Sequence, residues 1–440
     1  MNEPGPPKRA TTEATATKAG DDDGTAPHTG HDGWRGRPTA REIFVSLQSA
    51  DFRLLCLSSL TLGFGQWAQQ VALPWLALEL TGSATQIGGI AAVQGGIGLV
   101  TAPFAGYLAD RYPRRLVIVW STAGSALQAS LLAMLAISGT MELWQLYALA
   151  LAGGAFQSLT QPARQSFVFD ITTDETLVNA VTMNSLIQNF ARIGGPPLAG
   201  AMIGFWGVSA AFGFLAATKV LAVLLTLMIS KRTRQVRIGR GQNPVAQIAE
   251  GFRATWQDRR VLGLIVVHTI PTLFVIPYLP YLSVIAKTVL QGDASLFGLL
   301  TSMVGWGAVV GLFGLTLLRD PMRKGLLMLV CFTIYSACLI VVAISELRWL
   351  TMTMLVLVGF VNSVAFALNT TLVQMAARNE VRGRVMGIWQ LTSGLQPLGA
   401  LPMGFMIDRY GVPFGMGTFM VAATIVFILF TIVWPSVRKM

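Results

Sequence analysis

The densest group of charged side chains lies in the ten residues from Gly106 to Arg115, which read Gly-Tyr-Leu-Ala-Asp-Arg-Tyr-Pro-Arg-Arg. It contains one carboxylate, Asp110, and the guanidinium groups of Arg111, Arg114 and Arg115. The chemistry that these residues offer is ion pairing, because a carboxylate at the edge of an apolar layer is costly without a cation. Gly106 lacks a side chain, so another helix can approach closely there. The pattern predicts a charged hinge that takes a partner from elsewhere in the chain. An ordinary basic turn is the alternative.

Three other ionisable side chains, Arg192, Lys219 and His268, fall inside apolar stretches. Charges at such positions are costly and are functional candidates by default, and the sequence has no carboxylate at comparable depth. A cation in a cavity could attract an anionic substrate, although Lys219 could instead reach the membrane edge or meet backbone carbonyls. His268 could carry a proton, because imidazole titrates near neutral pH. A packed, hydrogen-bonded histidine is the alternative.

Catalytic and metal-binding patterns are absent from the sequence. The three cysteines lie in or beside apolar runs without ligand spacing, there are only three histidines, and no phosphate-binding loop with Lys-Ser or Lys-Thr occurs. We therefore expect no metal and no cofactor, and we exclude an enzyme and a pump driven by ATP.

Composition indicates a membrane protein. Of 440 residues, 53% are hydrophobic and 12% charged, against about 25% charged in soluble domains. The net charge of +11 does not indicate nucleic-acid binding, because most lysines and arginines fall in segments assigned to the cytoplasm. This is the positive-inside bias of membrane proteins. We expect a multi-pass protein of the inner (plasma) membrane with both termini cytoplasmic.

A membrane-spanning helix needs about 20 apolar residues, and twelve stretches meet that length. They lie at about 54–78, 84–109, 116–138, 143–168, 177–204, 208–230, 260–286, 295–318, 325–345, 349–376, 384–407 and 412–435. We expect the stretch at 260–286 to bend, since it contains Pro271, Pro277 and Pro280.

Polar segments divide these stretches into two sets of six. Residues 1–50 have the composition of a disordered cytoplasmic tail, 51–230 form a first six-helix bundle, 231–259 a basic cytoplasmic linker, and 260–436 a second bundle. Within the linker, residues 244–258 have the pattern of a short amphipathic helix at the inner leaflet.

The two sets are copies of one unit. Residues 195–213 align with 399–417 at a constant offset, which pairs Gly200 with Gly404 and Gly207 with Gly411. A duplicated six-helix unit implies two bundles related by an axis along the membrane normal, with the substrate path between them. The predicted fold class is therefore an all-α membrane protein with twelve transmembrane helices in two pseudo-symmetric six-helix bundles.

The motifs resemble the major facilitator superfamily of transporters. The hinge at 106–115 is similar to that superfamily's signature between helices two and three. More specific runs at 65–70, 161–165, 177–185, 191–200 and 382–387 resemble the branch of enterobactin exporters and macrolide efflux proteins, and the resemblance covers about residues 50–435.

The resemblance implies roles for two groups of residues. A conformational latch on the cytoplasmic side would join Asp110 to Arg384, with Arg164 as a second candidate partner and Gly106, Arg111 and Arg114 beside it. An export motif in helix five would consist of Arg192, Gly194, Gly195, Pro196 and Gly200. Generic tight packing is the alternative interpretation of these small residues.

Polar and aromatic residues at helical spacing predict the wall of a cavity, although each could equally be a contact between helices. With Lys219 and His268, these candidates are Gln66, Gln70, Gln188, Asn362, Asn369, Trp389 and Gln390.

Together these features predict a secondary transporter that works by alternating access. We expect it to be monomeric and to export a lipophilic or amphipathic small molecule of the drug, macrolide or siderophore class, driven by the proton gradient. An importer of the same fold and a membrane sensor without transport activity are the alternatives.

Overall fold

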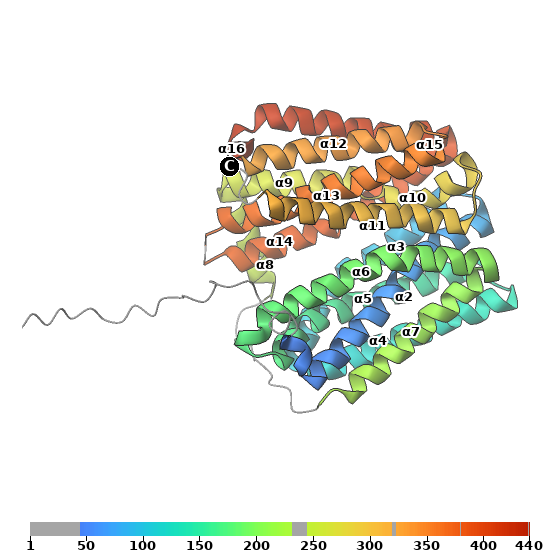
Figure 1. Ribbon diagram of the computed structural model, residues 1–440. Coiled ribbons are helices and arrows are strands. Elements are labelled where there is room, and N and C mark those ends of the chain that lie inside the picture. Colours follow the sequence, from blue (N-terminus) through green and yellow to red (C-terminus); the bar gives the residue numbers. More distant parts are fainter. Residues whose placement is uncertain (1–44, 231–243, 319–322, 379, 439) are drawn as a thin grey trace, which may run out of the picture. The chain divides into compact units, whose positions relative to one another are not determined.

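A computed structural model describes residues 45–230, 244–318, 323–378, 380–438 and 440 (Figure 1). All regular elements within these residues are helices. The predicted tail at 1–50 lies largely outside the described residues, and so do residues 231–243 of the linker. The surroundings of Gly106 and the side chain of Asp110 are not described either.

The first bundle consists of six long helices, drawn from blue to green in Figure 1. α2 packs against α6 and α7, α3 against α5, and α4 against α5 and α7. A 3₁₀ turn, η1 (Val45–Gln48), precedes them. The six helices are α2 (Ala50–Thr81), α3 (Ala84–Arg111), α4 (Arg114–Ser138), α5 (Leu143–Ile171), α6 (Asp174–Trp206) and α7 (Val208–Met228).

The second bundle is drawn from yellow to red. Like the first bundle it was predicted from six apolar stretches, but some of these stretches are divided into shorter helices. Its elements are α9 (Arg259–Phe274), α10 (Tyr278–Val284), the π-helical turn η2 (Ile285–Val289), α11 (Ala294–Leu317), α12 (Lys324–Ile344), α13 (Arg348–Ala376), α14 (Arg382–Ser393), α15 (Gln396–Val433) and α16 (Pro435–Arg438). The linker contains α8 (Pro244–Gln257), where the sequence predicts a helix.

Two predicted stretches are interrupted. The stretch at 260–286 breaks between α9 and α10, beside Pro277, and its bend is confirmed. The stretch at 384–407 is not one continuous helix, which corrects the prediction, because a turn at Gly394 and Leu395 separates α14 from α15. Gly394 is pressed against the side chain of Leu99 in α3, so a larger residue would collide there.

The internal repeat is visible in the backbone. Gly207, between α6 and α7, has φ 83° and ψ 170°, and its counterpart Gly411 has φ 80° and ψ 169°. Side chains other than hydrogen strongly disfavour this conformation. Each glycine therefore turns the chain sharply between the fifth and sixth helix of its copy. In the second copy, Gly411 divides the segment labelled α15 into two helices.

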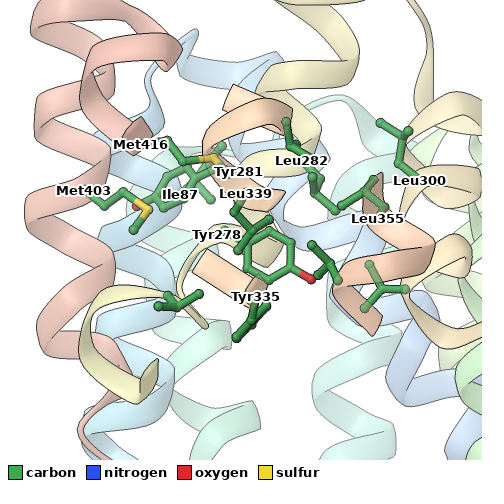
Figure 2. Packing of buried hydrophobic residues seen from close by; sticks show 14 of the residues in the cluster. Ile87, Tyr278, Tyr281, Leu282, Leu300, Tyr335, Leu339, Leu355, Met403 and Met416 are labelled. Carbon is green, nitrogen blue, oxygen red and sulfur yellow. The ribbon is translucent and has the colours of Figure 1, made fainter. Parts of the chain in front are cut away.

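The buried core is apolar and extends through both bundles. In Figure 2, Tyr278, Tyr335, Leu339 and Met403 belong to one packed cluster with Ile87 of the first bundle. The outer surface is apolar as well, and Trp144, Trp206 and Trp349 at helix ends are 65–70% exposed. An apolar exterior with aromatic side chains near the helix ends is typical of a membrane protein. By length and composition alone, seven described helices or helix runs are apolar enough to span a bilayer.

Candidate functional site

A cavity of about 360 Å³ lies between the two bundles. Its polar side chains are mostly glutamine amides from the first bundle, and the second bundle contributes mainly prolines and small residues. The glutamines are Gln66, Gln69 and Gln70 on α2, Gln94 on α3, Gln157 and Gln161 on α5, and Gln396 on α15. Ligand sites of this kind combine apolar walls with a few polar groups that orient the ligand. We call this space the central cavity.

A second, smaller space of about 60 Å³ lies within the first bundle. It is lined by the cations Lys219 on α7 and Arg164 on α5, together with Thr122, Ser125 and Gln188. We call it the side pocket. Four glutamines line both spaces, which therefore lie side by side: Gln66, Gln69, Gln157 and Gln161.

His268, on α9, lies one residue away from the central cavity. Its ring is 1% exposed and stacks on Trp389 with 4.3 Å between ring centroids. Nε2 lies 3.1 Å from the hydroxyl of Ser393, which lines the central cavity. Trp389 in turn donates from its indole N–H to Asn369 Oδ1 at 2.8 Å. The predicted residues His268, Trp389 and Asn369 thus form one cluster behind the cavity wall.

Of the remaining residues predicted to line a cavity, some do so and others do not. Gln66 and Gln70 line the central cavity, and Gln66 and Gln188 line the side pocket. Asn362 and Gln390 line neither space. Sequence reasoning missed Gln157 and Gln161, although they are four residues apart on α5, the same spacing that selected Gln66 and Gln70.

The glycine-proline run of α6 lies where the two bundles touch. A Cβ atom at Gly200 would lie 2.5 Å from the carbonyl oxygen of Ala294 and 3.0 Å from Cα of Gly298, both on α11. Ser302 of α11 donates its hydroxyl hydrogen to the carbonyl of Ile193 at 2.8 Å. Small residues therefore let the two backbones come into direct contact.

The residues of α2 that contact the glycine-proline run of α6 are aromatic. Cβ atoms at Gly194 and Gly195 would press on Phe64 and Trp67. The guanidinium of Arg192 lies 5.9 Å from the centroid of the Trp67 ring, which is a cation–π contact.

A second contact between the bundles involves Asp408 of α15. Its carboxylate accepts the backbone N–H groups of Ala84 and Thr85 at 2.6 and 2.8 Å and the hydroxyls of Ser83 and Thr85 at 2.5 Å each. The N-cap residue of α3, Ser83, makes no side-chain cap bond of its own. The second bundle thus supplies the cap of a helix in the first bundle, where unpaired N–H groups attract an anion. We call this side of the molecule the Asp408 end and the opposite side the Arg114 end.

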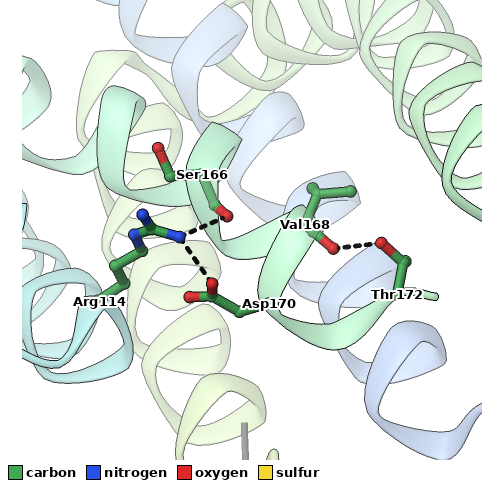
Figure 3. Close-up of polar contacts among 5 residues, drawn as sticks. All are labelled: Arg114, Ser166, Val168, Asp170 and Thr172. Carbon is green, nitrogen blue, oxygen red and sulfur yellow. Dashed lines mark hydrogen bonds and ion pairs between the residues drawn. The ribbon is translucent and has the colours of Figure 1, made fainter. Parts of the chain in front are cut away.

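At the Arg114 end, the predicted latch residues lie in different contacts. Arg114 forms an ion pair with Asp170 at 2.6 Å and also donates to the carbonyl of Ser166, as Figure 3 shows. This pair joins α4 to α5 inside the first bundle. Arg164 donates to the hydroxyls of Ser58 and Ser59 on α2.

Arg384, at the start of α14, forms an ion pair with Glu250 of α8. The Asp110 side chain lies outside the described residues, so its pairing with Arg384 stays a prediction.

We expect the Arg114–Asp170 pair to be important for stability, because both side chains are at most 9% exposed. Removing one partner of a buried ion pair leaves an uncompensated charge and costs about 3–5 kcal/mol. The single variants Arg114→Met and Asp170→Leu should lower the melting temperature of the purified protein, whereas the double variant should recover most of the loss. Arg378→Ala, which removes one partner of an exposed pair, is the control and should change little. Melting temperatures that fall equally in the double and single variants would contradict this account.

Two repeated helical bundles that meet along α3–α15 and α6–α11 around a central cavity define a transporter of the major facilitator class, not an enzyme. The family described as transmembrane secretion effector matches residues 42–438, and the chain belongs to this family.

Curated relatives include transporters of siderophores and drugs. The chain is 24% identical to the staphyloferrin A transporter of Staphylococcus aureus over 381 residues, which cover 81% of this chain and 89% of that protein. It is 25% identical to the multidrug efflux pump Tap of Mycolicibacterium fortuitum, with 82% and 90% covered. The enterobactin exporter EntS of Salmonella typhi is 26% identical over 319 residues, with 72% and 76% covered.

Solved structures show the same fold at low sequence identity. A bacterial homologue of the human lysosomal transporter Spinster, in an inward-facing and unoccupied conformation, superposes with a TM-score of 0.66 at 13% identity, covering 88% of this chain and 95% of that chain. The POT family transporter PepTSo superposes with a TM-score of 0.68 at 15% identity, covering 88% of this chain and 98% of that chain.

Proposed function

We propose that this protein exports a lipophilic or amphipathic small molecule from the cell by alternating access, driven by the proton gradient. The observation that carries the proposal is a cavity between two repeated bundles whose Asp408 end is held together by backbone contact and by the Asp408 cap. Such a cavity can be loaded from the Arg114 end and emptied after the bundles rock apart at the Asp408 end. The names of the relatives Tap and EntS support the outward direction.

The positions of the basic residues indicate that the Arg114 end faces the cytoplasm. Arg114, Arg115, Arg259 and Arg260 begin helices at the Arg114 end, and basic residues mark the cytoplasmic side of membrane proteins. In this orientation both termini are cytoplasmic, the described conformation is closed outward, and substrate enters from the cytoplasm or the inner leaflet. The exported molecule would belong to the drug, macrolide or siderophore class, and one copy of the chain would suffice for transport.

Export against a gradient needs a coupling group, and we assign that role to His268. It is buried, its Nδ1 has no hydrogen-bond partner among the described residues, and Nε2 faces the Ser393 hydroxyl at the cavity wall. A proton can therefore pass between the cavity and the ring through one hydroxyl group.

His268→Gln should uncouple transport from the proton gradient. In proteoliposomes the variant should still let substrate equilibrate down its own gradient but should no longer concentrate it when a pH gradient is imposed. The control is Thr269→Val on the same helix, since the Thr269 hydroxyl donates only within its own helix. Unchanged concentrative transport by His268→Gln would rule out this residue as the coupling group.

Accumulation assays test the proposed function itself. A compound panel that includes macrolides, siderophores and lipophilic dyes is measured in cells with and without the chain. Lower accumulation in cells that contain the chain is expected, and collapse of the pH gradient should abolish the difference. Higher accumulation of any compound would indicate an importer. Identical accumulation of every compound would favour a sensor and overturn the proposal.

A further inference from the structure

The side pocket contains two cations that have only neutral partners among the described residues. Lys219 Nζ donates to Ser125 Oγ at 2.5 Å and to Gln69 Oε1 at 3.3 Å. The two terminal nitrogens of Arg164 donate to hydroxyls of Ser58 and Ser59 at 3.1 and 2.7 Å. Lys219 is 7% and Arg164 9% exposed.

Burial of two cations in an apolar bundle is unfavourable without a counter-charge. The described part of the chain places no carboxylate in an ion pair with either residue. The described ion pair nearest to Arg164 along the sequence, Arg114 with Asp170, lies at the Arg114 end and includes neither Arg164 nor Lys219. An anion that enters from outside the protein would offset this cost.

The other lining groups are suited to an anion. The hydroxyl of Thr122 is buried, lines the pocket and has no hydrogen-bond partner in the described part of the chain. Hydroxyl and amide groups of Ser125, Gln157 and Gln188 line the same space. A volume of about 60 Å³ admits one small polar group but not a whole drug-sized molecule.

The central cavity lies beside the side pocket. If a small anionic group occupies the side pocket, the larger part of the same molecule lies in the central cavity. Gln66, Gln69, Gln157 and Gln161 border both spaces, whereas the central cavity adds apolar walls from Leu73, Ile87, Ile90 and the prolines. A molecule with an anionic group at one end and an apolar body at the other matches both spaces at once.

We propose that the side pocket is an anion subsite for the transported substrate, in which Lys219 and Arg164 bind a carboxylate or a similar oxyanion while the apolar body occupies the central cavity. This inference rests on the proposed export function and names its substrate class, anionic amphiphiles. Hydrogen bonds from a cation to an oxyanion, in which both partners are charged, are stronger than the bonds to neutral oxygens that the two cations now make, so the subsite discriminates strongly against uncharged analogues.

The test compares ligands that differ only in charge. The full chain is reconstituted in phosphatidylcholine nanodiscs, which lack anionic headgroups, and its melting temperature is measured with benzoate and 2-naphthoate and with the isosteric benzamide and 2-naphthamide. The acids should raise the melting temperature and the amides should not, and naphthoate should bind more tightly than benzoate because it buries more apolar surface.

Substitutions in the side pocket test whether the acids bind there. Lys219→Gln and Arg164→Gln should weaken naphthoate binding about 10-fold or more each, whereas Lys219→Arg, which keeps the charge, should retain most of it. The control is Lys287→Gln, whose ammonium group lies over Trp75 outside both spaces. If a glutamine variant does not fold, the comparison of acids with amides on the unchanged chain still tests the subsite.

Equal stabilisation by acids and amides, no stabilisation by either acid, or full naphthoate binding by Lys219→Gln would each overturn the subsite. These outcomes are independent of transport. A chain that binds naphthoate through Lys219 but exports nothing in the accumulation assays would instead contradict the proposed function.

Discussion

Replacing Gly298 by leucine is expected to abolish export, because this glycine lies where the backbones of α6 and α11, one from each bundle, are in direct contact. A Cβ atom at Gly298 would collide with the carbonyl oxygen of Pro196 and lie 3.0 Å from Cα of Gly200. These are backbone atoms, which cannot move aside as a flexible side chain can. Overpacking a tight contact costs about 1–3 kcal/mol, which is a factor of about 5–150 in an equilibrium between two states.

The measurement is compound accumulation in cells, together with the distance between spin labels at the Asp408 end. Labels attached through Thr140→Cys in the first bundle and Glu346→Cys in the second should move apart in Gly298→Leu. Gly213→Leu on α7 is the matched control, since a Cβ atom there would meet no atom within 4 Å. If Gly298→Leu exports normally and keeps the original label distance, contact between α6 and α11 is not part of the transport cycle.

The second large effect is expected for Asp408→Ala, which removes the cap that α15 supplies to α3. Four hydrogen bonds to one carboxylate are lost, and no side-chain cap from Ser83 replaces them. Because this carboxylate is partly exposed, we expect a net loss of about 1–2 kcal/mol, a factor of about 5–30 in the closed-to-open ratio. The same pair of spin labels should report a larger open population, and efflux should slow by a similar factor.

Glu142→Gln is the control for this prediction. Glu142 is also an N-cap carboxylate at the Asp408 end, but it caps its own helix, α5, and touches only residues of the first bundle. Its loss should leave the label distance unchanged. A label distance that responds equally to both substitutions would mean that the Asp408 cap stabilises a helix end without holding the bundles together. Asp408→Asn should fall between Asp408→Ala and the unchanged chain, since its single side-chain oxygen can accept only part of the lost bonds.

Much of the architecture follows from local sequence features. Long apolar stretches are helical in a bilayer because every backbone polar group must be satisfied within the segment. This constraint made α2 to α7 predictable. The repeat was predictable because Gly207 and Gly411 are needed for the same backbone conformation. The break between α14 and α15 was missed, although Pro397 in the first turn of α15 disfavours a continuous helix there. The contact of Gly394 with Leu99 of α3 could not be predicted, because it joins two helices.

Part of the site was predictable from the spacing of residues along a single helix. Gln66 and Gln70 share a face of α2, so periodicity alone selected them, and the same rule would have found Gln157 and Gln161. Periodicity does not reveal which helix faces which, and therefore it could not show that Arg164 and Lys219 line one pocket or that Asn362 and Gln390 line none.

The amino-acid sequence alone determined the membrane-spanning class, the duplicated unit, the small residues of α6 and the presence of cations without carboxylates at the same depth. These properties depend on composition and on spacing within one helix. Only the tertiary structure decided that Asp408 caps α3, that Arg114 pairs with Asp170, and that two cations share a pocket beside the central cavity. Each of those pairings joins residues from different helices, and the packing of helices, which is set by side chains all along their contacts, decides which residues meet.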